Sequence, residues 1–178
     1  VVAEDAAIDQ AALAIETACA SVIALQAPVA SELRFLIGAL RMSSTLERMG
    51  DLAAHIAKQV VLRHPAQPIP ADLRATFSMM GAIATSVVQK TAAVIELRDL
   101  NRAADVAVAD EQMDELHREL FEVVLSPSWA HGVEAAIDVT LLSRFYERFA
   151  DHGVTIARRV AYIVTGDMPT KSELAENA

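Results

Sequence analysis

Two pairs of carboxylates, each four residues apart, are the side chains of this sequence best suited to chemistry. Glu47 and Asp51 form the first pair, and Glu147 and Asp151 form the second. Residues four apart lie on one face of an α-helix, about 6 Å from each other. Carboxylate oxygens suit hard cations such as Mg²⁺, Mn²⁺, Ca²⁺ and iron. The spacing therefore predicts helices that present oxygen donors, either to a metal ion or to solvent.

Both pairs belong to a repeated segment. Residues 46–57 return 100 positions later as residues 146–157, with Glu, Arg, Asp, Ile and Ala in the same register. A weaker repeat, offset by 105 positions, relates residues 5–9 to residues 110–114. A duplication of this length indicates two copies of one helical unit.

The alternative is that the acids only solvate a helix face. The chain has 24 acidic residues, and pairs at this spacing also occur elsewhere, for example Glu134 and Asp138. A single pair is more typical of an exposed surface. Duplication in register makes a functional role about as well supported as a solvated helix face. His55 and His152 lie next to the pairs and could join a metal site, although each is more typical of an exposed polar residue.

Composition predicts that helices position these groups. The chain of 178 residues is 53% hydrophobic but only 4% aromatic, with six glycines and six prolines, which favours an all-α fold. The net charge of −9 argues against nucleic acid and anionic membranes as partners. The single cysteine, Cys19, excludes an internal disulfide and lies in an apolar helical pattern typical of a core. The longest uncharged stretches have 15 residues, too short to cross a bilayer, so we expect a soluble, cytoplasmic protein.

Helical periodicity predicts five helices, separated by proline-rich breaks. They cover residues 6–26, 29–63, 72–99, 102–125 and 133–165. Pro28 is expected in the first turn of the second helix, Asp72 as an N-cap and Gly166 as a C-cap. The predicted organisation is a first repeat over 1–64, a linker over 65–71, a second repeat over 72–166 and a flexible tail over 167–178.

In these segments the sequence resembles the PhoU family of phosphate-uptake regulators. The resemblance rests on Gln-Ala-Pro-Val-Ala-Ser-Glu-Leu-Arg at 26–34, on the two Glu-Arg-x-x-Asp motifs and on Thr-Gly-Asp at 165–167, and it covers nearly the whole chain. It implies two pseudo-symmetric three-helix bundles. The family normally has another long helix before the position of Val1, so we expect that helix to be deleted, cleaved or left out here. A first bundle without it would expose an apolar groove that another chain could fill.

The resemblance also implies metal sites, because some family members bind multinuclear clusters through such motifs. Carried over by position, the implied ligands are Glu47, Asp51, Asp5 and Asp9 in the first bundle and Glu147, Asp151, Asp110 and Asp114 in the second. The ion would be divalent or ferric: iron, Mn, Mg or Zn. The family commonly has His after the motif Asp and Asn three positions further, where this chain has Leu52 and His55 in the first repeat and His152 and Thr155 in the second.

The function implied by the resemblance is regulatory and non-enzymatic. Such a protein represses the phosphate-starvation response through contacts with the ATPase subunit of the phosphate transporter and with a sensor histidine kinase, and we expect it to be a homodimer. A rival hypothesis is a carboxylate-bridged di-iron oxidase, but those sites use Glu-x-x-His pairs, which this sequence lacks. A third hypothesis is a helical scaffold dimer whose acids only confer solubility.

Overall fold

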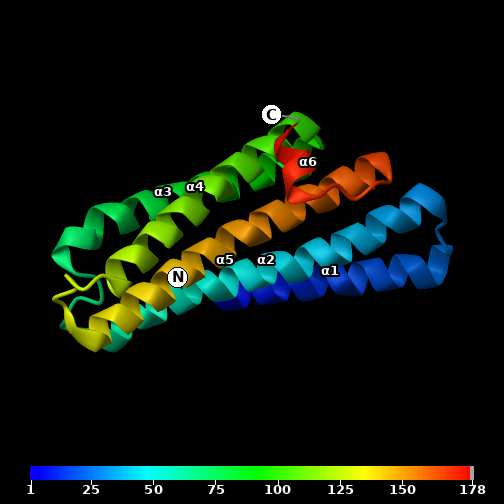
Figure 1. Cartoon of the computed structure of the whole chain (residues 1–178). Helices are drawn as coiled ribbons and strands as arrows, with labels where there is room; N and C mark the ends of the chain where they lie inside the picture. The colour runs from blue at the N-terminus through cyan, green and yellow to red at the C-terminus, as the bar shows by residue number, and fades with distance from the viewer. Residues whose placement is uncertain (177–178) are drawn as a thin grey trace.

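The computed structural model describes residues 1–176 and contains helices but no strand within that range, so the all-α prediction is confirmed. Five long helices run side by side (Figure 1). They are α1 (Asp5–Gln26), α2 (Ala30–Arg63), α3 (Arg74–Leu97), α4 (Leu100–Leu125) and α5 (Gly132–Thr165), and a short helix, α6 (Lys171–Ala175), follows them. The predicted helix boundaries hold to within a few residues.

Local backbone chemistry explains where these helices begin and end. Gly166 ends α5 at a φ of 94°, and its backbone N–H donates to the carbonyl of Tyr162 at 2.9 Å, so the predicted C-cap is confirmed. The first-turn position predicted for Pro28 and the N-cap predicted for Asp72 are wrong. Pro28 lies before Val29, the N-cap of α2, and Asp72 lies inside a short 3₁₀ helix (Ala71–Leu73) that precedes α3.

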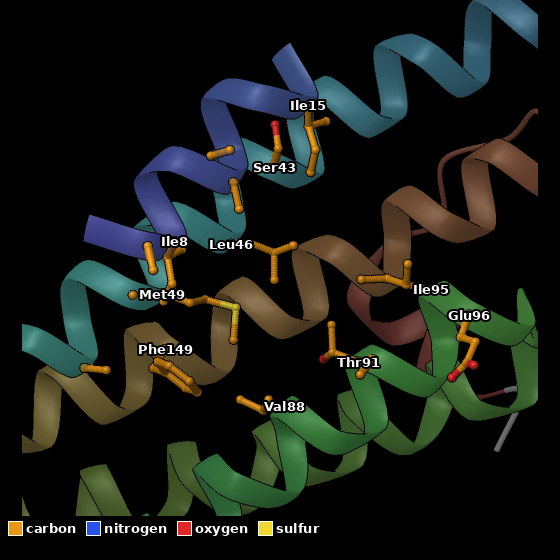
Figure 2. Close-up of a pocket in the computed structure, with 16 residues that line it drawn as sticks. Ile8, Ile15, Ser43, Leu46, Met49, Val88, Thr91, Ile95, Glu96 and Phe149 are labelled. Atoms are coloured by element: carbon orange, nitrogen blue, oxygen red, sulfur yellow. The ribbon is translucent and has the colours of Figure 1, made fainter. Parts of the chain in front are cut away.

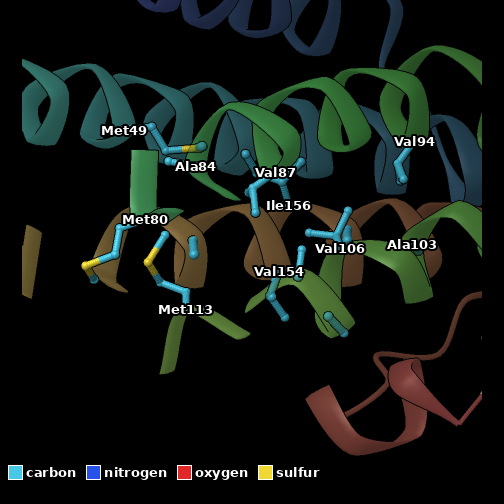
Figure 3. Packing of buried hydrophobic residues seen from close by; sticks show 14 of the residues in the cluster. Met49, Met80, Ala84, Val87, Val94, Ala103, Val106, Met113, Val154 and Ile156 are labelled. Carbon is cyan, nitrogen blue, oxygen red and sulfur yellow. The ribbon is translucent and has the colours of Figure 1, made fainter. Parts of the chain in front are cut away.

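The main core lies in the second repeat, where α3, α4 and α5 all pack against one another. Figure 3 labels several buried members of this core, among them the fully buried Met80, Val87, Val106, Met113 and Ile156. The first repeat joins this bundle where α2 packs along α5. Among the described helices α1 packs against α2 alone, and Cys19 is its one buried residue, as predicted for that cysteine.

The repeat relates α1 to α4 and α2 to α5, which leaves α3 without a counterpart in the first unit. An apolar groove of about 710 Å³ opens between α1 and α2 on one side and α3 on the other (Figure 2). Ile8, Leu46, Met49, Val88 and Ile95 are among its lining residues. The groove expected for a two-helix first bundle is therefore present.

The C-terminal segment differs from the expected flexible tail over 167–178. Lys171–Ala175 form α6, which packs mainly against α4 and buries Leu174 to 3% exposure. Thr170 and Glu173 form a capping box, each accepting a hydrogen bond from the other's backbone N–H. Residues 177–178 of the predicted tail lie outside the described residues.

Two helices are long and apolar enough to span a membrane by composition alone, in contrast to the expectation that no segment is. They are Asp5–Gln26 and the stretch Ala71–Leu97, with mean hydropathies of 1.5 and 1.2. Core helices of soluble proteins pass the same test, and α3 is one wall of the main core, whereas the Asp5–Gln26 window is only 6% buried. The two helices are therefore weak evidence for insertion.

Candidate carboxylate site

The structure brings together the four acids that the sequence predicts for the second repeat. Asp110 and Asp114 come from α4, and Glu147 and Asp151 come from α5. Burial raises the pKa of both Asp110 and Glu147, and the negative charges of Asp114 and Asp151 add to this rise at each of them. We call these four residues the second carboxylate cluster.

Two cations of the chain itself bind this cluster. The Lys171 ammonium of α6 forms an ion pair with Asp110 and lies 2.8 Å from Oδ2 of Asp114. On the other side, Nη1 of Arg144 lies 2.5 Å from Oε2 of Glu147. The negative charge of the cluster is thus partly neutralised within the protein.

Burial controls the protonation of these groups. Asp110 is 0% exposed, and loss of solvation raises its pKa to about 6, although Lys171 opposes that shift. Burial likewise raises the pKa of Glu147. Burial acts to lower the pKa of Lys171, but its hydrogen bonds to Asp110 and Asp114 outweigh that effect and raise the pKa above its usual range. Lys171 therefore stays charged.

The oxygens of this cluster have the chemistry that a hard cation needs. Oδ1 of Asp110 is buried and has no hydrogen-bond partner among the described residues, and carboxylate oxygens suit Mg²⁺, Mn²⁺ or iron. However, no three His, Cys, Asp or Glu side chains within residues 1–176 converge closely enough to hold a metal ion. In this arrangement the Lys171 ammonium lies against the α4 oxygens, so metal binding stays a prediction.

The acids predicted for the first repeat are spread over three places. Asp9 and Glu47 line one cavity of about 470 Å³, together with Glu16, which the sequence analysis did not select. Oδ1 of Asp5 is buried without a hydrogen-bond partner beside Gly50. Asp51 lines a different cleft, between α2 and α5. Glu16 lies seven residues after Asp9, two helical turns away on the same face, and this spacing could have identified it.

The cleft between α2 and α5 brings the two repeats together. It measures about 410 Å³, and its charged and aromatic lining residues are Arg48, Asp51, His55, Arg144, Phe145, Arg148 and His152. The His55 ring lies 5.5 Å from that of Phe145. Burial and the charges of Arg148 and Arg48 lower the pKa of His152. The two histidines therefore share a cleft with arginines, and neither completes a convergent metal site within the described residues.

Comparison with known proteins identifies the fold. A sequence model described as the PhoU domain matches residues 1–60 and 77–160. The chain belongs to the PhoU family. The phosphate-specific transport system accessory protein PhoU homolog 1 of Mycobacterium leprae is 47% identical over 147 residues, which cover 83% of this chain and 66% of that protein. The phosphate-specific transport system accessory protein PhoU homolog 2 of Mycobacterium tuberculosis is also 47% identical over 147 residues, which cover 83% of this chain and 69% of that protein.

Solved PhoU structures have the same fold. The crystal structure of PhoU from Streptococcus pneumoniae aligns with a TM-score of 0.83 and 30% identity, covering 95% of this chain and 79% of that one. PhoU from Pseudomonas aeruginosa aligns with a TM-score of 0.78 and 25% identity, covering 92% and 79%. The chain spans about two thirds of the length of the mycobacterial relatives. The resemblance noted from the motifs is confirmed, and so is the helical-bundle fold.

Sequence reasoning missed the residue of this PhoU chain that contacts the carboxylate cluster most closely. Lys171 lies in the segment expected to be flexible, 57 positions after Asp114. One signal was available, because Thr170-x-x-Glu173 is a capping-box pattern and predicts a helix start. The capping-box pattern does not predict which helix this segment packs against.

Proposed function

We propose that this chain is a negative regulator of the phosphate-starvation response and of phosphate uptake. Its membership of the PhoU family carries the proposal, because curated relatives at 47% identity are named accessory proteins of the phosphate-specific transport system. The repeated Glu-Arg-x-x-Asp motifs, on which the family resemblance rests, lie on α2 and α5, the helices that join the two repeats.

The proposed mode of action is protein–protein contact without catalysis. The partners would be the ATPase subunit of the phosphate transporter and the sensor histidine kinase, both met at the cytoplasmic side of the membrane, with the protein itself a homodimer. The apolar groove and the cleft between α2 and α5 are the concave surfaces best suited to such contacts. The oxidase alternative is less favoured because its sites use Glu-x-x-His pairs, which this sequence lacks.

We also propose that the carboxylates take up divalent or ferric ions. In the second repeat Asp110, Asp114, Glu147 and Asp151 would hold the ion, and in the first repeat Asp9 and Glu47 are the closest candidates, with Asp5 and Asp51 nearby along the helices. A bound cation would neutralise these carboxylates and cross-link the helices that carry them. The protein would contribute to such a site by packing acid-bearing helices side by side, α1 against α2 and α4 against α5.

A phosphate-starvation reporter in a strain without this gene tests the proposal. In ample phosphate, the wild-type gene should restore repression, whereas a variant with Glu47, Asp51, Glu147 and Asp151 all changed to Ala should not. The matched control changes four exposed acids of α4, Asp105, Glu111, Glu119 and Glu122, to Ala and should repress normally. Immunoblotting verifies that each variant accumulates.

The outcomes separate the regulatory role from the role of the acids. A reporter that stays active with the wild-type gene would refute the regulatory function. Full repression by the four-site variant would instead refute a functional role for the repeated acids and favour the scaffold hypothesis.

A further inference from the structure

We propose that the cleft between α2 and α5 binds a hydrogen phosphate ion, which is held by the guanidinium groups of Arg48 and Arg148. The proposed function uses this cleft only as a surface for protein partners. Neither the repeat nor the family comparison assigns it a ligand. The inference therefore goes beyond the proposed function and does not depend on it.

The lining of this cleft is positively charged, in contrast to the chain as a whole. It contains three arginines and one carboxylate, that of Asp51, whereas the whole chain has 24 acidic and 15 basic residues. One of the three arginines, Arg144, is already paired with Glu147 at 2.5 Å. Within residues 1–176 the guanidinium groups of Arg48 and Arg148 form no ion pair. These two groups are therefore available to an anion.

The repeat brings Arg48 and Arg148 to the same place. They occupy equivalent positions 100 residues apart, on two helices that pack along each other. Both lie near one ring, because burial and then the charges of Arg148 and Arg48 lower the pKa of His152. A guanidinium presents several N–H donors in one plane, a geometry that matches the oxygens of a phosphate. Two such groups in one cleft can hold a single oxyanion between them.

The carboxylate of Asp51 favours one kind of oxyanion. It lines the same cleft, is half-buried and forms no ion pair within the part of the chain that the structure describes. Sulfate carries only acceptors at neutral pH, so this carboxylate would repel it. Hydrogen phosphate keeps a proton and can donate a hydrogen bond to Asp51 while its other oxygens accept from the arginines. The lining thus discriminates against sulfate.

The same argument favours the free ion over a phosphorylated side chain. A phosphoryl group attached to a serine has a second pKa of about 6, so it has lost most of its acidic protons at neutral pH. Free hydrogen phosphate keeps a proton on one oxygen even as the dianion, and this proton supplies the donor that Asp51 can accept. The cleft, of about 410 Å³, has room for the ion and bound water.

Equilibrium dialysis of the purified full chain against radiolabelled phosphate tests the proposal. A chelator in the buffer removes metal ions, so that phosphate carried by a metal at the carboxylates does not contribute. Arg48→Ala and Arg148→Ala each remove one guanidinium, Asp51→Asn removes the negative charge, and unlabelled phosphate, sulfate and phosphoserine act as competitors. The matched control is Arg74→Ala, because Arg74 is an exposed arginine of α3 outside the cleft. Circular dichroism verifies folding.

We expect the wild type and Arg74→Ala to bind phosphate with equal affinity. Arg48→Ala and Arg148→Ala should each weaken binding about tenfold or more, because each removes charge-assisted hydrogen bonds to the ion. In the wild type, sulfate and phosphoserine should compete poorly. Asp51→Asn should raise the affinity for sulfate relative to phosphate on the order of tenfold, because the repulsion is lost.

Several outcomes would contradict this assignment. Absence of phosphate binding to the wild type would overturn the proposal, as would equal binding by the wild type and the two arginine variants. Stronger competition by phosphoserine than by unlabelled phosphate would overturn the free ion as ligand and favour a phosphorylated partner. Sulfate competition that Asp51→Asn leaves unchanged would overturn the selective role of Asp51.

The reporter experiment is judged separately from this one. Phosphate binding by a chain that does not restore repression would count against the regulatory function alone. Repression by a chain that does not bind phosphate would count against this inference alone. Both arginine variants retain every acid proposed as a metal ligand, so their effect does not depend on the metal sites.

Discussion

Gly153 lies where α5 packs closely against side chains of α3. A Cβ added there would lie 2.5 Å from Cγ1 of Val87 and 3.2 Å from Oγ1 of Thr91, and both side chains are buried. Alanine is favoured over glycine in a helix by about 1 kcal/mol, but overpacking a core costs about 1–3 kcal/mol. The second effect dominates wherever the neighbour cannot move aside.

We therefore predict that Gly153→Ala lowers the free energy of unfolding by about 1–2 kcal/mol. Gly81→Ala is the matched control, because a Cβ on that glycine of α3 would meet only the Tyr146 hydroxyl, at 3.9 Å. This control should be neutral or stabilising by up to about 1 kcal/mol. Urea denaturation measures both variants, and equal destabilisation by the two would contradict the close approach.

At the scale of elements, a group of hydrogen bonds and ion pairs joins the end of α2 to the start of α5. Arg63 donates from Nε to Oδ2 of Asp138 at 2.6 Å and from Nη2 to Oδ1 at 2.9 Å, and it also pairs with Glu134. Gln59 donates to Oδ1 of Asp138 at 2.6 Å, and that aspartate is only 2% exposed. The bidentate geometry fixes how the two repeats meet.

Asp138→Ala should destabilise the protein by about 2–4 kcal/mol, because it removes a buried acceptor of three hydrogen bonds, leaves the Gln59 amide without this acceptor and leaves Arg63 with Glu134 alone. Thermal and urea unfolding would measure the loss. Glu115→Ala is the control, since its ion pair with Arg118 is 61% exposed on both sides and should be worth less than about 1 kcal/mol. Losses of equal size would show that Asp138 does not join the repeats.

At the scale of the whole molecule, the groove between the two repeats presents an apolar surface to solvent. Its lining comes from α1, α2, α3 and α5, and Leu46 on its wall is 36% exposed. A concave apolar surface of this kind binds apolar ligands or a partner helix.

We predict that this 178-residue chain enhances the fluorescence of the dye 1-anilinonaphthalene-8-sulfonate, because the dye's aromatic rings fit the groove. Ala92→Glu places a carboxylate on the groove wall and should abolish most of the enhancement. Ala82→Glu makes the same change at another exposed alanine of α3 that does not line the groove, and it should have little effect. Equal enhancement in both variants would show that the dye binds elsewhere.

Local chemistry in the sequence determined the helices and their repeat. Apolar periodicity, prolines and Gly166 depend on neighbours within one or two turns, so the five long helices, their approximate ends and the relation of α2 to α5 could be predicted. The same holds for Cys19, whose apolar neighbours at helical spacing predicted burial. The wrong positions predicted for Pro28 and Asp72 involve shifts of only a few residues at helix ends, where boundaries are least sharply defined.

Tertiary packing decided which acids meet and what they meet. Asp9 and Asp51 lie on helices of the same repeat, yet they line different cavities. Glu134 and Asp138 look like any acid pair in the sequence, but the crossing of α2 and α5 supplies Arg63. Lys171 reaches Asp114 across 57 positions from a short helix whose Leu174 is buried against the bundle. Such contacts depend on how whole helices pack, and helical periodicity specifies the face of a residue but not the partner opposite it.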